Sequence, residues 1–264
     1  MQQVPIKIQN SLLDWFSHHQ RKVPWRIENS TQRNPYFVWV SEIMLQQTRV
    51  EAVIPFFKNW ILKFPTIQKL AHAKEEDVLA CWAGLGYYSR ARNLQKGAKF
   101  ILQEFAGELP SDPATLEKIP GIGPYTAGAI SSLAYNKKVP IVDGNIVRIF
   151  SRLYSWDFRM ETSAKHKNQY WEQAKVWAQR SPKKTNEAMM ELGALICRPK
   201  SPKCNHCPVE NICTSRSNDE VALYPPPKKK TPKINISGCM VLFQHKNQYL
   251  VVKPKAKELL HNLW

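Results

Sequence analysis

The chain has 264 residues, of which 43% are apolar, so it is long enough and apolar enough to fold around one or two globular cores. Lysine and arginine outnumber aspartate and glutamate by 38 to 21, and the net charge of +17 favours a polyanionic partner, although a generally solvated basic surface gives the same total. Because it has neither a membrane-length apolar run nor a signal peptide, we expect a cytoplasmic chain whose six cysteines are not joined in disulfides.

Apolar residues recur every three or four positions from about residue 8 to residue 220, which predicts helices throughout this part of the chain. Prolines and a glycine-rich turn at Gly84–Gly86 divide the pattern into helix-length segments. Asp112, between Ser111 and Pro113, is typical of an N-cap that precedes a short helix. The pattern predicts an all-α body.

Residues 36–53 form a strongly apolar predicted helix in which Glu42 is the unusual residue. Beside Trp39 and Ile43, its carboxyl would be desolvated, which raises the pKa and lets it hold a proton near neutral pH. The alternative is an ordinary glutamate at the surface, or one paired with Arg49. The residue alone does not decide between the two.

The segment from Pro120 to Asp143 combines a glycine turn, a helix start and a carboxylate. Gly121 and Gly123 can adopt backbone angles closed to other residues, and Thr126 lies where a helix begins with its free N–H donors. Such a turn can bind a phosphate without reading sequence, and it would place Asp143 near the captured backbone. Gly-x-Gly pairs also serve as plain turns, so this reading stays open.

A compact cysteine cluster follows the helical body, with the spacing C-x6-C-x2-C-x5-C. Zinc sites usually have two paired-cysteine knuckles separated by a longer insert, whereas this spacing suits a [4Fe–4S] cluster held by four thiolates. Zinc and free buried thiols are the alternatives. The ligands of the predicted cluster are Cys197, Cys204, Cys207 and Cys213.

The composition changes after residue 220. Residues 224–230 are rich in proline and lysine and predict an extended linker. Beyond it, residues 239–243 and 248–252 read as two strands on either side of a polar turn at 244–247. We expect these strands to begin a second domain whose remainder is missing from the chain.

Four features together resemble the helix-hairpin-helix DNA glycosylases that carry an iron–sulfur cluster: the hairpin at 120–126, the aspartate at 143, the cysteine spacing and the helical body. Within that superfamily the chain is similar to the bacterial A/G-specific adenine glycosylases, the MutY family. The most specific stretches are residues 41–42 with 45–48, 84–89, 142–145, 186–187 and 191–193.

The resemblance implies an all-α, two-lobed fold. A six-helix barrel with the helix-hairpin-helix would span residues 25–136, and a lobe carrying the iron–sulfur cluster would combine residues 1–24 and 137–219. A linker at 220–233 would lead to residues 234–264, the start of a truncated NUDIX-like domain. In the family this domain recognises 8-oxoguanine, so its truncation implies weaker discrimination of 8-oxoguanine from guanine.

The resemblance also implies catalytic roles. Glu42 would protonate the leaving adenine, and Asp143, with Asn145 beside it, would stabilise the positively charged sugar or act as a transient nucleophile. Tyr125 occupies the hairpin position where strand-cutting relatives carry a Schiff-base lysine. A tyrosine cannot form that bond, so the resemblance implies base removal without lyase activity.

Further residues are implied to contact the flipped base or the DNA. The wall of the adenine pocket would be formed by Trp25, Arg26, Leu45, Val50 and Glu187. The DNA would be contacted, and its vacated stack filled, by Gln47, Thr48, Tyr87, Tyr88, Gly121, Gly123 and Thr126. The chain departs from the family in its longer connection from Pro24 to Tyr36, with Asn34 in place of an aspartate, which leaves the position of Arg26 in doubt.

The implied partner is double-stranded DNA with an A:8-oxoguanine or A:G mismatch, bound by a monomer in the bacterial nucleoid. One alternative is a thymine mismatch glycosylase of the same superfamily, which also keeps a tyrosine at the hairpin. Another is a truncated fragment that binds DNA with little turnover.

Overall fold

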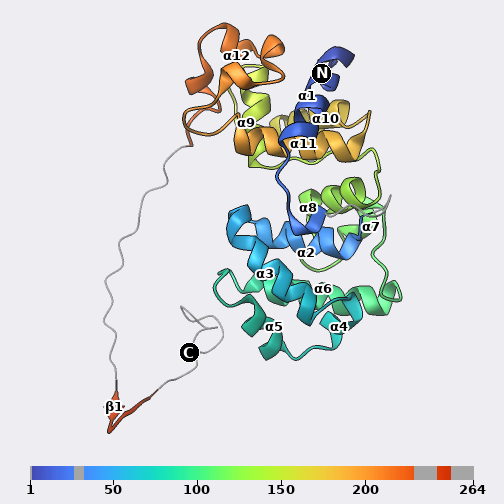
Figure 1. Ribbon diagram of the computed structural model, residues 1–264, viewed down its shortest axis with the longest axis vertical. Coiled ribbons are helices and arrows are strands. Elements are labelled where there is room, and N and C mark those ends of the chain that lie inside the picture. The colour runs from blue at the N-terminus through green and yellow to red at the C-terminus, as the bar shows by residue number, and fades with distance from the viewer. Residues whose placement is uncertain (1, 27–32, 229–242, 251–264) are drawn as a thin grey trace. The chain divides into compact units, whose positions relative to one another are not determined.

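A computed structural model describes residues 2–26, 33–228 and 243–250 (Figure 1). By their internal contacts, residues Met1–Pro227 form one compact unit and residues Lys228–Trp264 a second, smaller one. Each unit is described by itself below.

The first unit is helical, as predicted, but the single helix predicted over residues 36–53 is two helices separated by residues 46–49. Its described α-helices are α1 (Ile6–His19), α2 (Pro35–Leu45), α3 (Val50–Lys63), α4 (Ile67–His72), α5 (Glu75–Trp82), α6 (Ser89–Glu104), α7 (Pro113–Leu116), α8 (Pro124–Ala129), α9 (Gly144–Leu153), α10 (Ala164–Trp177), α11 (Pro182–Leu195) and α12 (Thr214–Ser217). Helix α8 begins at Pro124, two residues before the predicted start, and continues as a π-helical segment over Ile130–Ala134.

Short polar side chains start several of these helices. Asp112 caps α7 by accepting from the Thr115 N–H, which confirms the predicted N-cap. Asn34 caps α2 by accepting from the N–H groups of Tyr36 and Phe37, so the asparagine at this position still acts as a cap. Asp143 caps α9 in the same way, through the N–H of Ile146. The caps set where the helices that frame the site begin.

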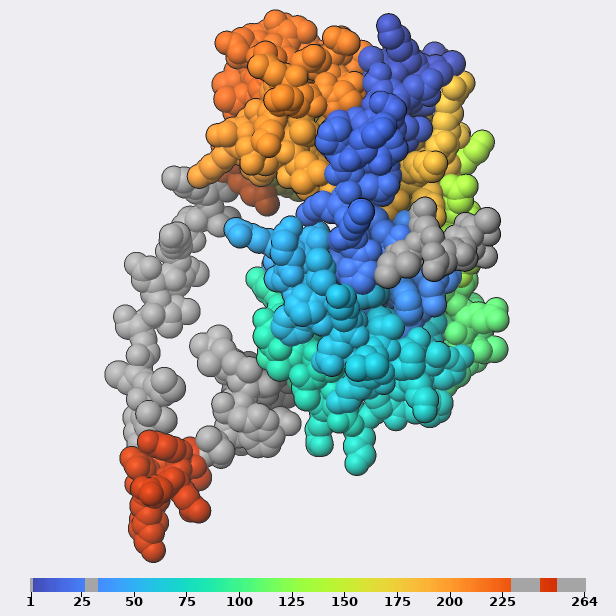
Figure 2. All heavy atoms as spheres, viewed as in Figure 1, coloured from blue at the N-terminus to red at the C-terminus, as the bar shows by residue number. Residues whose placement is uncertain are grey.

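Buried apolar side chains form two clusters. One contains Val23 and Trp25, residues of helices α2 to α8 and of the π-helical segment, and Ile141. Three tryptophans of this cluster, Trp39, Trp60 and Trp82, are fully buried. The other joins α1 to α9, α10, α11 and Val209. Figure 2 shows the blue N-terminal helix lying against the orange segments late in the unit, as expected from the packing of α1 on α11. The division into two structural lobes stays a prediction, because residues 1–227 form one compact unit.

Helix α2 packs on α8 and its π-helical continuation, and α11 packs on that continuation from the other cluster. The chain segments that carry Glu42, Tyr125 and Glu187 are therefore brought together by the packing of α2, α8 and α11. This junction holds the candidate site.

The predicted linker is held to the helical unit over its first residues. Residues Val221–Leu223 form a short 3-10 helix, the Arg152 Nε donates to the Tyr224 carbonyl over 3.0 Å, and an Arg159 Nη donates to that of Pro226 over 2.6 Å. These charged donors explain why the unit extends to Pro227. The rest of the predicted linker, from 229, lies outside the described residues.

The described part of the second unit is a hairpin, with β1 (Gln244–His245) antiparallel to β2 (Gln248–Tyr249). Its strands extend into the polar residues predicted as a turn, so that the turn is only Lys246-Asn247. Residues 239–242 and 251–252 of the predicted strands, and most of the predicted NUDIX-like segment, lie outside the described residues. In the part of the chain that is described, no helix combines the length and apolarity needed to cross a membrane.

Candidate active site

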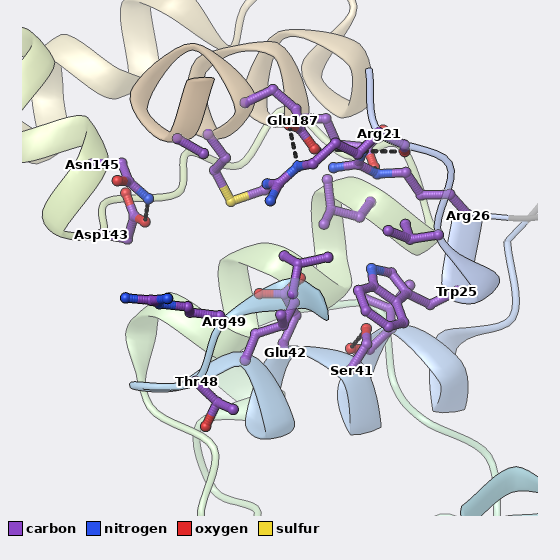
Figure 3. A pocket seen from close by; sticks show the side chains of 18 of the residues that line it. Arg21, Trp25, Arg26, Ser41, Glu42, Thr48, Arg49, Asp143, Asn145 and Glu187 are labelled. Carbon is purple, nitrogen blue, oxygen red and sulfur yellow. Dashed lines mark hydrogen bonds and ion pairs between the residues drawn. The ribbon is translucent and has the colours of Figure 1, made fainter. Parts of the chain in front are cut away.

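A cavity of about 300 Å³ opens where α2, α8, α11 and the start of α9 meet (Figure 3). Of the predicted catalytic and pocket residues, it brings together Trp25, Arg26, Glu42, Leu45, Val50, Tyr125, Asp143, Asn145 and Glu187. Thr48, predicted to contact DNA, also lines it. These residues come from five separate segments, and only the fold makes them neighbours.

Glu42 lies at the floor of this cavity with 6% of its surface exposed. Burial raises the pKa of Glu42 to about 7, and the nearby carboxylates of Asp143 and Glu187 push it the same way. The Tyr125 hydroxyl donates to Glu42 Oε2 over 2.5 Å, which opposes that shift. Among the described residues, no ion pair joins Glu42 to Arg49. The carboxyl is therefore suited to hold a proton near neutral pH and to release it to a bound group.

Asp143 faces the same cavity but is bound differently. Its Oδ1 accepts from the Ile146 N–H and its Oδ2 from Asn145 Nδ2, each over 2.8 Å. Burial raises the pKa of Asp143, while these donors and the Arg148 guanidinium oppose the rise because they favour the charged form. Arg148 in turn donates to Asn145 Oδ1 over 2.8 Å. Asp143 is thus the carboxylate of the pair whose hydrogen-bond donors favour the charged form.

One wall of the cavity is a row of alternating positive and negative side chains, an arrangement that the sequence did not predict. Arg21 and Arg26 both bind Glu191, over 2.9 Å and 2.7 Å, and Arg26 and Arg33 both bind Glu187, over 3.0 Å and 2.6 Å. Burial opposes the charge of Arg26, but its two glutamate partners outweigh burial and raise its pKa. Arg26 is therefore fixed at the cavity despite the longer connection that precedes α2, of which residues 27–32 lie outside the described residues.

Two loops carry the residues predicted to fill the DNA stack. Gln47, exposed, follows the end of α2, and Tyr87 and Tyr88 follow the Gly84–Gly86 turn, exposed by 64% and 36%. Gln47 and Tyr87 both have a left-handed backbone, with φ of 59° and 49°. This exposure agrees with side chains that reach out of the protein.

The hairpin differs in part from the prediction. Gly121 has a φ of 84°, and a Cβ there would lie 2.8 Å from that of Asn93, so glycine is required. Gly123 has a φ of −100° with open space around it, an angle that any residue can adopt, so its predicted need for glycine is wrong. Thr126 is only 2% exposed, and its side chain packs inside the protein instead of facing a ligand.

The four clustered cysteines are free thiols that line one small cavity with apolar side chains such as Leu192 and Val209. An Arg152 Nη donates to Cys197 Sγ over 3.4 Å. Burial raises the pKa of Cys207 to about 12, because a buried site disfavours the charged thiolate. Within the described residues, no group of three or more His, Cys, Asp or Glu side chains is arranged so that it could hold a metal ion.

Comparisons with known proteins agree with this fold. The family described as "HhH-GPD superfamily base excision DNA repair protein" matches residues 40–175. A solved thermostable thymine-DNA glycosylase superposes with a TM-score of 0.71 at 25% identity, covering 80% of this chain and 95% of the other. A non-covalent endonuclease III–DNA complex superposes with a TM-score of 0.64 at 21% identity, covering 80% and 94%, which shows a shared fold. The fold is therefore the helical one of base excision DNA repair proteins.

Among curated proteins, the adenine DNA glycosylase of Buchnera aphidicola subsp. Schizaphis graminum is 39% identical over 96% of this chain and 72% of its own length. That of Rattus norvegicus is 43% identical over 77% of this chain and 40% of its own length. The chain belongs to the adenine DNA glycosylase family of the HhH-GPD superfamily. It spans about two fifths of the length of the rat and human relatives.

Proposed function

We propose that this chain is a DNA glycosylase that hydrolyses the bond between adenine and deoxyribose where adenine faces 8-oxoguanine or guanine in duplex DNA. The observation that carries the proposal is the pairing of two unlike carboxyl groups in one cavity. Glu42 is buried with a pKa raised to about 7, and Asp143 is held by donors that favour its charge. The mismatched duplex, bound by a monomer in the bacterial nucleoid, is part of the proposal.

The proposed reaction divides its charges between these two groups. Protonated Glu42 transfers its proton to N7 of an adenine flipped into the cavity, so that the C1′–N9 bond breaks with its electrons on the base. The sugar then carries positive charge, which ionised Asp143 stabilises. Water adds to C1′ and loses a proton, giving free adenine and an abasic site. The Arg26–Glu187 pair offers a donor and an acceptor to the edge of the base.

The decisive test is base release from matched duplexes that contain A:8-oxoguanine, A:G or T:G. We expect adenine to be released from the first two and thymine to be retained in the third, because thymine is a pyrimidine and has no N7 to accept the proton from Glu42. The products are separated by chromatography after single-turnover incubation. Thymine release without adenine release would overturn the proposal in favour of a thymine mismatch glycosylase, and DNA binding without release of either base would favour a binding fragment.

The absence of a lysine at the hairpin leads to a second expected result. Tyr125 occupies the hairpin position at which the strand-cutting proteins that this chain resembles carry a lysine. Its hydroxyl donates to Glu42. We expect no covalent protein–DNA complex after borohydride treatment, because no Schiff base can form at a phenol. Denaturing gels of the treated mixture measure this. A strong trapped band from the wild-type chain contradicts it, and Tyr125→Lys serves as the positive control.

We also propose that Cys197, Cys204, Cys207 and Cys213 hold a [4Fe–4S] cluster. The fit rests on four free thiols around one cavity, with Arg152 beside Cys197 to offset the negative charge of a thiolate-bound cluster. When bound, such a cluster would tie the loop from 197 to 213 to α9 and α11.

We expect about four irons per chain. Iron and zinc analysis with visible absorbance measures this, and zinc in a colourless protein contradicts it. Cys81, buried outside the cluster, is the control position: Cys81→Ser should keep the iron, and Cys204→Ser should lose it.

A further inference from the structure

Arg90 is a buried cation in α6 that the proposed chemistry does not use. Only 9% of its surface is exposed, and among the described residues it forms no ion pair with a carboxylate. Its guanidinium instead donates to backbone carbonyls and lies over the rings of Trp82 and Tyr87, at 5.2 Å and 5.6 Å from their centroids. Burying a charge without a counter-ion costs free energy, so the hydrogen bonds of the guanidinium must offset that cost.

The carbonyls that Arg90 binds belong to two separate segments. One Nη donates to the carbonyls of Ile43, Met44 and Gln46 over 2.9, 3.2 and 2.6 Å. These are carbonyls that the last turn of α2 leaves without helical partners, and a cation there also complements the helix dipole. The other Nη donates to the carbonyls of Leu85 and Gly86 over 3.0 and 3.2 Å. One side chain therefore joins the end of α2 to the glycine turn before α6.

Each joined segment leads directly into an exposed residue with a left-handed backbone. Gln47 follows Gln46 and has a φ of 59°, and Tyr87 follows Gly86 and has a φ of 49°. Non-glycine residues adopt this conformation at a cost, and it persists where the surroundings impose it. The bonds from Arg90 end one residue before each of them, which is where such a constraint has to act.

We propose that Arg90 is a positioning residue that sets the separation and direction of Gln47 and Tyr87, so that both enter the duplex together when a base is extruded. The inference rests on the proposed function, in which these two side chains occupy the space that the base leaves. It concerns extrusion and not the chemical step. Lysine cannot replace Arg90, because one ammonium has three donors at a single point, whereas the planar guanidinium reaches both segments at once.

The test compares Arg90→Lys with Arg92→Lys, a partly exposed position on the same helix that pairs with Glu75. Each protein is given two duplexes, one with adenine opposite 8-oxoguanine and one with adenine as an unpaired single-nucleotide bulge. A third duplex carries 2-aminopurine in place of the paired adenine, and its fluorescence at saturating protein reports unstacking. Thermal unfolding checks that each variant is folded.

We expect Arg90→Lys to slow release from the paired duplex roughly tenfold to hundredfold, as displacements of positioning groups do. Release from the bulge should stay within about threefold of wild type, because a bulged base has little stacking to lose. The 2-aminopurine signal should fall in parallel with the rate on the paired duplex, and Arg92→Lys should match wild type throughout. Equal losses on both duplexes, or no loss on the paired one, would overturn the inference, since a merely structural role displaces Glu42 for either substrate.

Gly86→Ala keeps the test decisive if Arg90→Lys does not fold. Gly86 has a φ of 69° and open space around its Cα, so alanine strains the tyrosine loop without a clash and without touching α2. The same selectivity for the bulge is expected, and equal losses on the two duplexes contradict the inference. A wild-type chain that releases no adenine from any duplex would refute the proposed function instead, so the two failures are distinct.

Discussion

Glu42→Gln is expected to reduce adenine release by about a thousandfold while DNA binding persists, because the amide has no proton to transfer. The substitution keeps the size of the side chain and an oxygen that can accept from the Tyr125 hydroxyl. Release by the wild-type chain should also fall as the pH rises through about 7, where Glu42 loses its proton. Single-turnover rates between pH 5.5 and 9 measure both effects.

The same substitution should stabilise the protein at high pH. Glu42 has a pKa of about 7 in the folded chain against an ordinary value of 4.5, so the folded state holds a proton that the unfolded state has lost. Stability from this group is therefore greatest below about pH 4.5, declines as the pH rises to about 7 and stays low above it. At pH 8 we expect Glu42→Gln to raise the free energy of unfolding by up to about 3 kcal/mol.

Urea unfolding at pH 5 and pH 8 measures this gain, which should be much smaller at pH 5. The matched control is Glu76→Gln, on the exposed side of α5, which should change neither stability nor release. Unchanged adenine release by Glu42→Gln would contradict the assignment of the acid, whatever the stability data show.

Asp143→Asn is expected to slow adenine release by about a hundredfold to a thousandfold, because the sugar loses the negative charge that faces it. The fold should survive, since asparagine is as good an N-cap as aspartate and can still accept from the Ile146 N–H. Binding to DNA that already contains an abasic site should change little. Release rates and DNA binding, measured on the same preparation, separate the two effects.

Asp112→Asn is the matched control for this prediction. Asp112 caps α7 with the same geometry, accepting from the Thr115 N–H over 2.9 Å, but it does not line the cavity. It should lose as little stability as Asp143→Asn and keep full activity. Equal activities of the two variants would show that Asp143 acts only as a helix cap.

Much of the candidate site was predictable from local patterns. The helical periodicity, the cap at Asp112 and the exposure of the two tyrosines after the Gly84–Gly86 turn follow from neighbouring residues, and all three are confirmed. The unusual position of Glu42 in an apolar helix also indicated a raised pKa. The hairpin was less predictable, because the need for glycine depends on φ and on neighbours such as Asn93, which lies far from Gly121 in the sequence.

Local composition therefore specified the helices, the compact cysteine run and the chemical types of the acid and the carboxylate, since these depend on residues close together in the chain. The fold alone placed the Tyr125 hydroxyl on Glu42, 83 residues away, and alternated Arg21, Arg26 and Arg33 with Glu187 and Glu191. It also decided that Thr126 points inward and that Arg90 joins two loops. Such contacts depend on how helices pack, and the pKa of a buried group depends on what that packing brings near it.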